Sequence, residues 1–301
     1  MNRILLVGAD GQLGFELLRA LAPLGLVMPA TLSGRLPGGA SCFALDLSQP
    51  GSAGNAVREL RPTIVVNAAA YTAVDRAEDD VALARRINAE AVAELAEACV
   101  EVQARIVHYS TDYVFPGDRD AAYTEGDSPA PLSVYGQTKR EGELAVIDST
   151  ANHLIFRTAW VYAARGHNFL RTMLKLAAER SELRVVADQI GSPTPARWLA
   201  TTTALALSRS DRPSGLWHAV ASGYTSWHGF AQAIIEDAAA AGLLTRVPDV
   251  VPIATSDFPT RARRPAHSVL DCSALEADFG LNLPDWREGV RHVVAELASD
   301  R

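Results

Sequence analysis

Short apolar runs alternate with stretches of helical periodicity from the N-terminus onward. Segments that each contain a short apolar run, and that can each form one buried strand, are residues 3–7, 26–35, 42–47, 63–70, 105–115 and 153–162. Continuous apolar runs of this length are typical of parallel strands that are covered on both faces. The alternation predicts an α/β fold, with a doubly wound parallel sheet in residues 1–160 and a smaller C-terminal lobe in residues 161–301. We expect the boundary near residue 160 to be blurred, with strands that interweave between the two parts.

Helices are expected where apolar residues recur every three or four positions. The leucines of residues 13–21 predict a helix after the first strand, and residues 84–98 predict another. Ser133, which follows a segment rich in proline, is placed to cap a further helix. We expect Glu141 and Glu143 to lie on the outward face of that helix.

A glycine-rich turn joins the first strand to the first helix. Gly8 permits a tight turn, Gly11 lets the backbone approach a pyrophosphate, and Gly14 lets the helix pack closely on the strand. The helix N-terminus adds amide hydrogens and the positive end of its dipole. Strand, turn and helix in this order predict a dinucleotide-binding domain of the Rossmann type.

The end of the second strand bears on the choice between NAD and NADP. An acidic residue there would hold the ribose 2′-hydroxyl of NAD, but residues 26–35 contain no Asp or Glu. Ser33 and Arg35 are instead suited to a 2′-phosphate, although Arg35 also fits an ordinary loop cation. The sequence therefore favours NADPH and leaves NADH open.

Tyr135 and Lys139 stand one helical turn apart and therefore share a helix face. Because a neighbouring ammonium stabilises a phenolate, we expect Lys139 to lower the pKa of Tyr135. Thr111 precedes Tyr135 by 24 residues (135 − 111 = 24), at the carboxyl end of the fifth strand, where ligands lie in open parallel sheets. The three side chains predict a site in which Thr111 holds a carbonyl oxygen and Tyr135 donates a proton to it.

Several sequence blocks resemble the motifs of one enzyme family. The Gly-x-x-Gly-x-x-Gly spacing is similar to that of extended short-chain dehydrogenases/reductases. Residues 67–78, 157–160, 188–194 and 264–271 resemble the dTDP-4-dehydrorhamnose reductase family. Related sugar-nucleotide 4,6-dehydratases place Asp-Glu after the threonine. Here Asp-Tyr follows Thr111, so the base needed for dehydration is missing.

The resemblance implies reduction of the C4 ketone of dTDP-4-dehydro-6-deoxy-L-mannose to dTDP-L-rhamnose by NAD(P)H, with Thr111, Tyr135 and Lys139 as catalytic residues. It also implies that the C-terminal lobe binds the substrate. Two alternatives stay open: another nucleotide-sugar 4-ketoreductase or epimerase, and a non-catalytic NADP-binding regulatory subunit of the same fold.

Binding residues are carried over position by position from the same resemblance and from the glycine turn. Those expected to bind the cofactor are Gly8, Asp10, Gly11, Gln12, Leu13, Gly14, Ser33, Arg35, Asp46, Leu47, Ala68, Ala69, Ala70, Tyr71, Tyr135 and Lys139. Those expected to bind the dTDP-sugar are Val74, Thr111, Asp112, Tyr113, Trp160, Arg263 and Arg264. The last two are candidates for the substrate diphosphate because guanidinium groups match phosphate oxygens.

Composition limits the remaining partners. The formal net charge of −7 argues against nucleic acid, and no apolar run approaches the ~18 residues that span a bilayer. The cysteines Cys42, Cys99 and Cys272 form neither a metal pattern nor a disulfide framework. Free thiols in a reducing cytoplasm are therefore expected.

The sequence says least about metal binding and about the oligomeric state. Some relatives carry a carboxylate shortly after residues 188–194 that helps to bind Mg²⁺ at a dimer contact, whereas this chain has Arg197 there. Glu16 remains as a ligand from the first helix. We expect no metal-ligand set within the chain, and we leave Mg²⁺ and a homodimer open.

Overall fold

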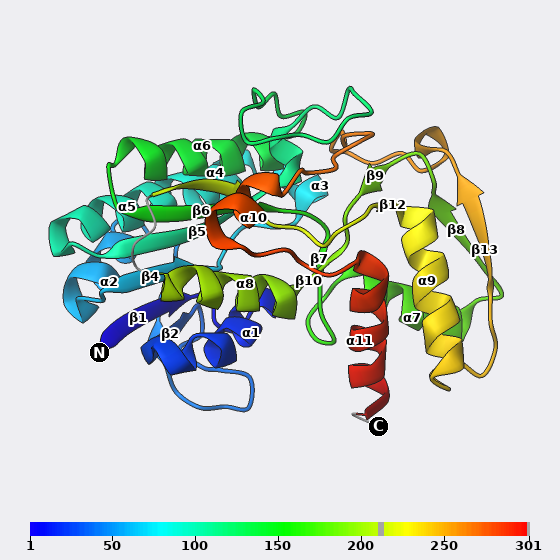
Figure 1. The fold of residues 1–301 in the computed structure, drawn as a ribbon, viewed down its shortest axis with the longest axis horizontal. Helices are drawn as coiled ribbons and strands as arrows, with labels where there is room; N and C mark the ends of the chain where they lie inside the picture. Colours follow the sequence, from blue (N-terminus) through cyan, green and yellow to red (C-terminus); the bar gives the residue numbers. More distant parts are fainter. Residues whose placement is uncertain (210–213, 300–301) are drawn as a thin grey trace.

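A parallel sheet forms the centre of the structure, a computed structural model that describes residues 1–209 and 214–299. Within these residues seven strands lie in the order β11-β6-β5-β4-β1-β2-β3, and all neighbours are parallel (Figure 1). They are β1 (Asn2–Val7), β2 (Gly25–Thr31), β3 (Phe43–Ala44), β4 (Ile64–Asn67), β5 (Arg105–Thr111), β6 (His153–Thr158) and β11 (Gly215–His218). The strand order reverses between β1 and β4, where ligands bind in such sheets. The predicted doubly wound fold is confirmed.

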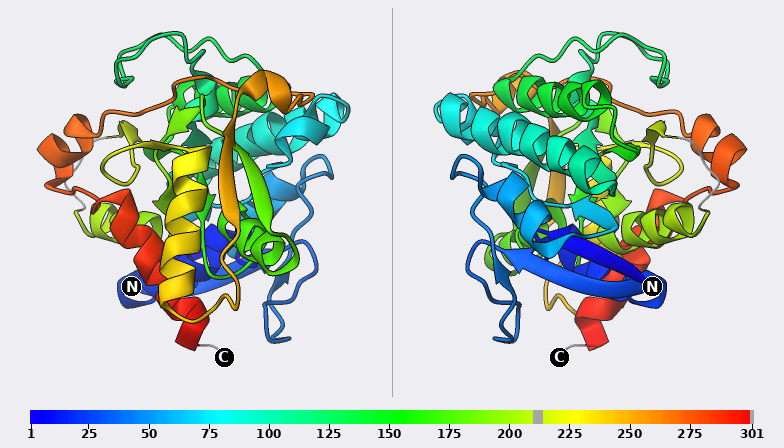
Figure 2. Two further views of the ribbon diagram at one scale, coloured as in Figure 1. Left: turned by 90° about the vertical axis from the view of Figure 1, so that its right-hand side faces the viewer. Right: turned by 90° about the vertical axis from the view of Figure 1, so that its left-hand side faces the viewer.

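Helices cover both faces of this sheet, as the two side views in Figure 2 show. One face carries α1 (Gln12–Ala20), α8 (Ala196–Ser208) and α10 (Ser273–Phe279), and the other carries α2 (Ser52–Leu60), α5 (Ala91–Val102) and α6 (Val134–Asp148). Side chains alternate along β1, so Ile4 and Leu6 enter the first core while Leu5 and Val7 enter the second. This explains why the strand is apolar at every position from residue 4 to residue 7.

The chain beyond residue 160 builds a smaller core and also returns to the large sheet. Three two-stranded sheets pair β7 (Val161–Tyr162) with β10 (Thr194–Pro195), β9 (Ile190–Gly191) with β12 (Thr225–Ser226), and β8 (Glu182–Val186) with β13 (Asp249–Ile253). Apolar side chains around Phe230 and Ile234 pack between α7 (Phe169–Glu179), α9 (Trp227–Ala240) and α11 (Trp286–Ser299), on the right of Figure 1. In contrast, β11 is a strand of the large sheet, and α8 and α10 pack on it, so the two parts interweave.

The remaining helical segments are short. They are α3 (Val74–Ala77), α4 (Val81–Arg85), η1 (Ala22–Leu24), η2 (Arg86–Glu90), η3 (Asp112–Val114) and η4 (Thr255–Asp257). The helix predicted over residues 84–98 is interrupted by η2, a π-helical turn. Within it, Asn88 Oδ1 accepts the Tyr71 amide (2.8 Å) and Asn88 Nδ2 donates to the Tyr71 carbonyl (3.1 Å). The wider turn therefore fixes the backbone that follows β4.

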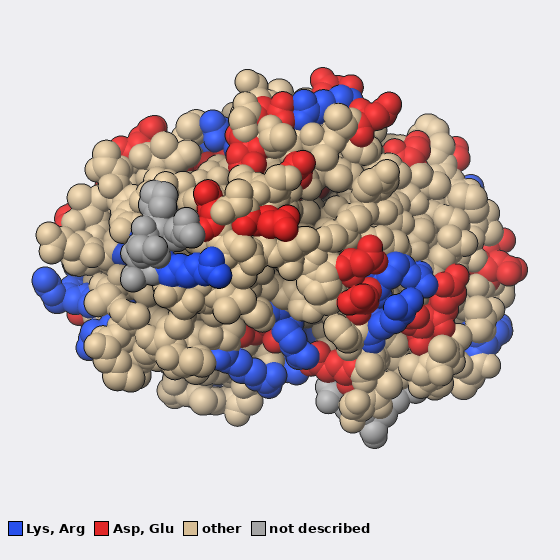
Figure 3. Space-filling view, viewed as in Figure 1, with Lys and Arg blue, Asp and Glu red and all other residues tan. Residues whose placement is uncertain are grey.

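Charged side chains of both signs are interspersed on the face drawn in Figure 3. Exposed ion pairs include Arg58–Glu101 and Arg287–Glu236. Solvent screens such pairs, so they contribute little to the stability of the fold. Among the described residues, no helix combines the length and the apolar character needed to cross a membrane.

Candidate active site

A cavity of about 830 Å³ opens at the carboxyl ends of the central strands. Of the predicted binding and catalytic residues, those that line it are Gly8, Asp10, Gly11, Gln12, Leu13, Ala68, Ala69, Ala70, Val74, Thr111, Asp112, Tyr113, Tyr135, Lys139 and Trp160. They come from the first turn, from the segments after β4 and β5, from α6 and from the end of β6. The tertiary structure therefore gathers segments that are up to about 150 residues apart (160 − 8 = 152).

The glycine turn has the shape that a pyrophosphate requires. Gly8 has a left-handed φ of +79°, and a Cβ added there would lie 2.7 Å from the Ala69 nitrogen. A Cβ at Gly14 would collide with the Gly8 carbonyl oxygen, so this residue permits α1 to pack against the turn. Gly11 is the N-cap of α1 and supplies no capping side chain, which leaves the first amides of the helix available to a ligand. These features fit the phosphates of a dinucleotide.

Some of the predicted cofactor-binding residues lie outside the cavity wall. Ser33 and Arg35 are exposed in the loop after β2, beside the glycine turn, where the Gly8 amide donates to the Ala30 carbonyl (2.9 Å). Asp46 accepts the Ser48 amide (2.9 Å) just beyond β3, next to the buried Leu47. The hydroxyl of Tyr71 donates to Asp80 (2.6 Å), so its side chain points away from the cavity wall.

The start of α6 is held by side chains and by close backbone packing. Ser133 accepts the Gly136 amide (3.2 Å) as the predicted N-cap, and Glu78 accepts the Val134 amide (2.9 Å). A Cβ at Gly136 would collide with the Tyr113 carbonyl oxygen. Gly136 therefore allows α6 to approach the end of β5, which brings Tyr135 next to the Tyr113 ring, with centroids 5.9 Å apart.

Lys139 is buried and turned toward β5. Its Nζ donates to the Tyr109 carbonyl oxygen (2.6 Å) and lies 3.5 Å from His108 Nε2. Burial lowers the pKa of Lys139 to about 8, while the charge of Glu143 acts in the opposite direction. Burial and the Lys139 charge hold the pKa of His108 well below its usual value, so His108 is neutral.

The expectation that Lys139 lowers the pKa of Tyr135 is wrong for this structure. Burial raises the pKa of Tyr135 to about 12, Thr111 opposes this by hydrogen bonding, and the Asp112 charge adds to it. Lys139 does not contribute because its ammonium faces the Tyr109 carbonyl. Tyr135 is therefore fully protonated near neutral pH, which is the form that a proton donor needs.

Glu143 is a second departure from the sequence prediction, because it is buried rather than turned outward. Its carboxylate accepts two hydrogen bonds of 2.8 Å from Arg157, which is 2% exposed, and one of 2.6 Å from Arg140. Residues 135, 139 and 143 are spaced by four, so they share one helix face. That spacing was the available signal for the burial of Glu143.

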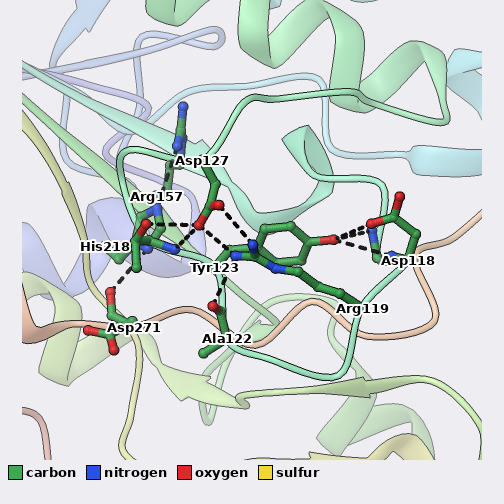
Figure 4. Close-up of polar contacts among 10 residues, drawn as sticks. Asp118, Arg119, Ala122, Tyr123, Asp127, Arg157, His218 and Asp271 are labelled. Carbon is green, nitrogen blue, oxygen red and sulfur yellow. Dashed lines mark hydrogen bonds and ion pairs between the residues drawn. The ribbon is translucent and has the colours of Figure 1, made fainter.

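A stack of side chains connects this ion pair to the loop after β5, and Figure 4 shows Arg157 at one end and Tyr123 with Arg119 at the other. The Arg157 guanidinium lies 4.9 Å from the centroid of the Phe115 ring, which stacks on Tyr123 at 4.3 Å. On the far side, Arg119 lies 4.1 Å from the Tyr123 ring and pairs with Asp127. The stack anchors the loop that precedes Ser133 to the buried Arg157.

His218 lies beside Arg157 in the same view and has a structural environment. Its amide donates to Glu125 (2.7 Å), and its Nδ1 lies 3.1 Å from the Asp271 carbonyl oxygen. Burial and the Arg157 charge lower the pKa of His218 to about 4. A neutral ring at this position avoids a second buried positive charge beside Arg157.

The far wall of the cavity is aromatic. Trp160, at the end of β6, stacks on Trp227 with centroids 3.5 Å apart and an interplanar angle of 4°. Trp227 also lines the cavity, although sequence reasoning assigned it no role. A Cβ at Gly191 would lie 2.6 Å from the Trp160 ring, so the glycine of the 188–194 block makes room for this stack.

The predicted diphosphate-binding arginines lie beside the cavity rather than in its wall. Arg264 makes two hydrogen bonds to Asp75, of 3.1 and 2.7 Å, and Arg263 is exposed. Arg261 pairs with Asp79 in the same way. These pairs join the segment after β4 to the segment that precedes α10.

The side chains considered for Mg²⁺ form ion pairs. Glu16 accepts a hydrogen bond from Arg197 (3.1 Å), and Arg197 also donates to Glu296 (2.8 Å). Within the part of the chain that the structure describes, no group of three or more His, Cys, Asp or Glu side chains is placed to hold a metal ion.

Known proteins with the same sequence pattern and fold identify the class. The dTDP-4-dehydrorhamnose reductase of Burkholderia thailandensis is 48% identical over 306 residues, covering 99% of both chains. That of Escherichia coli K12 is 47% identical over 298 residues, covering 98% of this chain and 97% of the relative. The crystal structure of the Bacillus anthracis reductase in complex with NADP superposes with a TM-score of 0.88 at 36% identity, covering 98% of this chain and 99% of that one.

Together with the parallel sheet and the glycine turn, these similarities define an oxidoreductase of the short-chain dehydrogenase/reductase type. The family model described as the RmlD substrate binding domain matches residues 1–299. The chain belongs to the dTDP-4-dehydrorhamnose reductase family.

Proposed function

We propose that this chain reduces the C4 ketone of dTDP-4-dehydro-6-deoxy-L-mannose to dTDP-L-rhamnose with NADPH. The observation that carries the proposal is the match, over nearly the full length and at 48% and 47% identity, to reductases named for this reaction. The cavity at the strand ends supports it, because Thr111, Tyr135 and Lys139 meet there beside the glycine turn. The free thiols fit a reducing compartment, so we place the reaction in the cytoplasm.

Each of the three residues has a task that its surroundings support. Tyr135 is protonated near neutral pH and donates its proton to the oxygen at C4 as charge develops there. Thr111 positions that oxygen by a hydrogen bond. Lys139 is buried and close to Tyr109, and we assign it to the hydroxyls of the nicotinamide ribose. Trp160 and Trp227 form the wall against which the sugar packs.

The cofactor is held by the first turn and by the loop after β2. NADPH supplies the hydride that goes to C4 of the sugar. Gly8, Gly11 and the start of α1 hold the pyrophosphate, while Ser33 and Arg35 face the 2′-phosphate. Thr158 has a buried hydroxyl at the cavity that lacks a protein partner among the described residues, and a ligand can satisfy it there.

The reaction is tested by generating dTDP-4-dehydro-6-deoxy-L-mannose in situ and following NADPH oxidation. We expect oxidation that depends on the sugar nucleotide, with dTDP-L-rhamnose as the product. In the matched control the same assay is run with a 4-keto sugar nucleotide that carries a different sugar. Preference for that control would assign a different ketoreductase, and no oxidation with either substrate would refute the proposal.

Replacing Arg35 by Ala is expected to raise KM for NADPH by about tenfold or more. A hydrogen bond to a charged group contributes about 1.5–3 kcal/mol, which the substitution removes from the binding of NADPH. NADH has no 2′-phosphate, so its KM is expected to stay unchanged. Steady-state kinetics with both cofactors measure the change. Arg180→Ala, at the exposed end of α7, is the matched control. An equal loss with NADH would show that Arg35 does not read the 2′-phosphate.

A further inference from the structure

Asp112 is a buried carboxyl group whose hydrogen-bond partners are uncharged. Its side chain is 2% exposed, Ser268 Oγ donates to its Oδ2 (2.6 Å), and its Oδ1 lies 3.0 Å from Thr111 Oγ1. Across residues 1–209 and 214–299 it has no ion-pair partner. Burial raises the pKa of Asp112 to about 7, although the hydrogen bonds from Ser268, Thr111 and the backbone oppose this rise.

The ionisable groups around Asp112 do not neutralise it. Tyr113 in the same turn and Tyr135 in α6 are phenols whose pKa values are raised by burial, so both are neutral near pH 7. Arg264 lies in the segment that carries Ser268. Its charge and a hydrogen bond act to lower the pKa of Tyr113, and it pairs with Asp75. Lys139 donates to the Tyr109 carbonyl. The neutral form of Asp112 is therefore the one that its surroundings favour as the pH falls below about 7.

The Thr111 hydroxyl has one proton and two lone pairs. One lone pair accepts the Tyr113 amide (3.2 Å). A charged Asp112 can only accept, so it takes the Thr111 proton and leaves only an acceptor facing the cavity. A neutral Asp112 with its proton on Oδ1 donates to Thr111 instead, which frees the Thr111 proton to point toward Tyr135 and the cavity. A ketone oxygen accepts hydrogen bonds and needs this second arrangement.

We propose that Asp112 is a positioning residue that works in its neutral form and makes Thr111 a hydrogen-bond donor to the reacting oxygen. This rests on the proposed ketone reduction. The role differs from direct contact with the substrate, because Asp112 acts through Thr111. It also gives Ser268 a task, since its hydroxyl holds Oδ2 and leaves Oδ1 to face Thr111.

The first test compares the dependence of kcat on pH in Asp112→Asn and Asp112→Ala. The Asn amide donates to Thr111 at every pH and still accepts from Ser268. In the wild type we expect kcat to fall as the pH rises through about 7, which is the basic limb of the pH profile. In Asp112→Asn this limb is expected to move up by about one pH unit, toward the Lys139 pKa of about 8. Asp112→Ala removes both the acceptor and the donor, so Thr111 keeps its proton but loses the group that orients its hydroxyl, and kcat is expected to fall about tenfold or more at every pH. Asp249→Asn, exposed in β13, is the matched control.

A graded variant covers the case in which Asp112→Ala does not fold. Ser268→Ala removes a hydrogen bond that stabilises the carboxylate, so the pKa of Asp112 rises and the basic limb moves up. An unmoved limb in both Asp112→Asn and Ser268→Ala would overturn the proposal. So would an Asp112→Asn variant as inactive as Asp112→Ala, because a carboxylate would then be required.

An infrared measurement separates this proposal from the proposed function. The difference spectrum of the wild type minus Asp112→Asn is expected to contain the carbonyl stretch of a protonated carboxyl below about pH 7 and to lose it above. Absence of that band would overturn the inference whatever the activity. A wild type that shows the band but oxidises no NADPH would refute the reaction and leave the protonation state established.

Discussion

Replacing Tyr135 by Phe is expected to lower kcat by about 10²–10⁴-fold, which is the usual contribution of a positioned proton donor. The ring and its contact with Tyr113 stay, so NADPH binding is expected to change by less than about tenfold. The phenol is buried and protonated near neutral pH, and removing its hydroxyl leaves the developing oxygen charge without a donor. Steady-state kinetics and quenching of protein fluorescence by NADPH measure the two quantities.

The control for this substitution is Tyr224→Phe. Tyr224 is 62% exposed and does not line the central cavity, so both kcat and NADPH binding are expected to stay as in the wild type. Turnover by Tyr135→Phe close to the wild-type rate would show that another group supplies the proton. A parallel loss of NADPH binding would instead indicate damage to the cofactor site.

Glu143→Gln is expected to reduce the free energy of unfolding by about 3–5 kcal/mol. The substitution leaves the Arg157 guanidinium buried without its counter-charge, and breaking a buried pair from one side has this typical effect. Urea denaturation at neutral pH measures the change. Glu141→Gln, two residues earlier, is the matched control, because Glu141 pairs with Arg85 at the surface, where solvent screens the pair and its loss is expected to change the free energy of unfolding little.

The difference between the wild type and Glu143→Gln should depend on pH in a defined direction. Burial raises the pKa of Glu143, but hydrogen bonds and charge from Arg157 outweigh it and leave the folded pKa below the usual value. Such a group stabilises the fold above its unfolded pKa of about 4.3, and the contribution fades as the pH falls through the lower folded value. A difference that stays constant down to acidic pH would contradict the ion-pair explanation.

Local spacing was sufficient for most of the fold and for the centre of the site. The apolar runs, the glycine turn and the Tyr135–Lys139 spacing depend on neighbours within one or two turns of chain, and these interactions act wherever the segment lies. The Ser133 cap is of the same kind, since its partner is only three residues away. Because strands and helices alternate along the chain, the doubly wound sheet could be predicted as well.

Local spacing missed burial and partners that are distant in the sequence. Glu143 was predicted to be outward because acidic side chains usually are, yet Arg157 from β6 makes its burial tolerable. Asp75 meets Arg264 across 189 residues, so the arginine that was assigned to a diphosphate already has a carboxylate partner. Nothing within the local pattern of either residue indicates such a partner.

Local patterns along the chain were enough to predict which segments form the sheet, where a dinucleotide can lie, and which phenol, ammonium and hydroxyl meet at the strand ends. The protonation of these groups depends on how the folded chain packs around them. Lys139 turns to the Tyr109 carbonyl, and Tyr135 and Asp112 are raised in pKa by burial. The physical reason is that spacing fixes which side chains are near one another, whereas desolvation depends on every segment that packs around them.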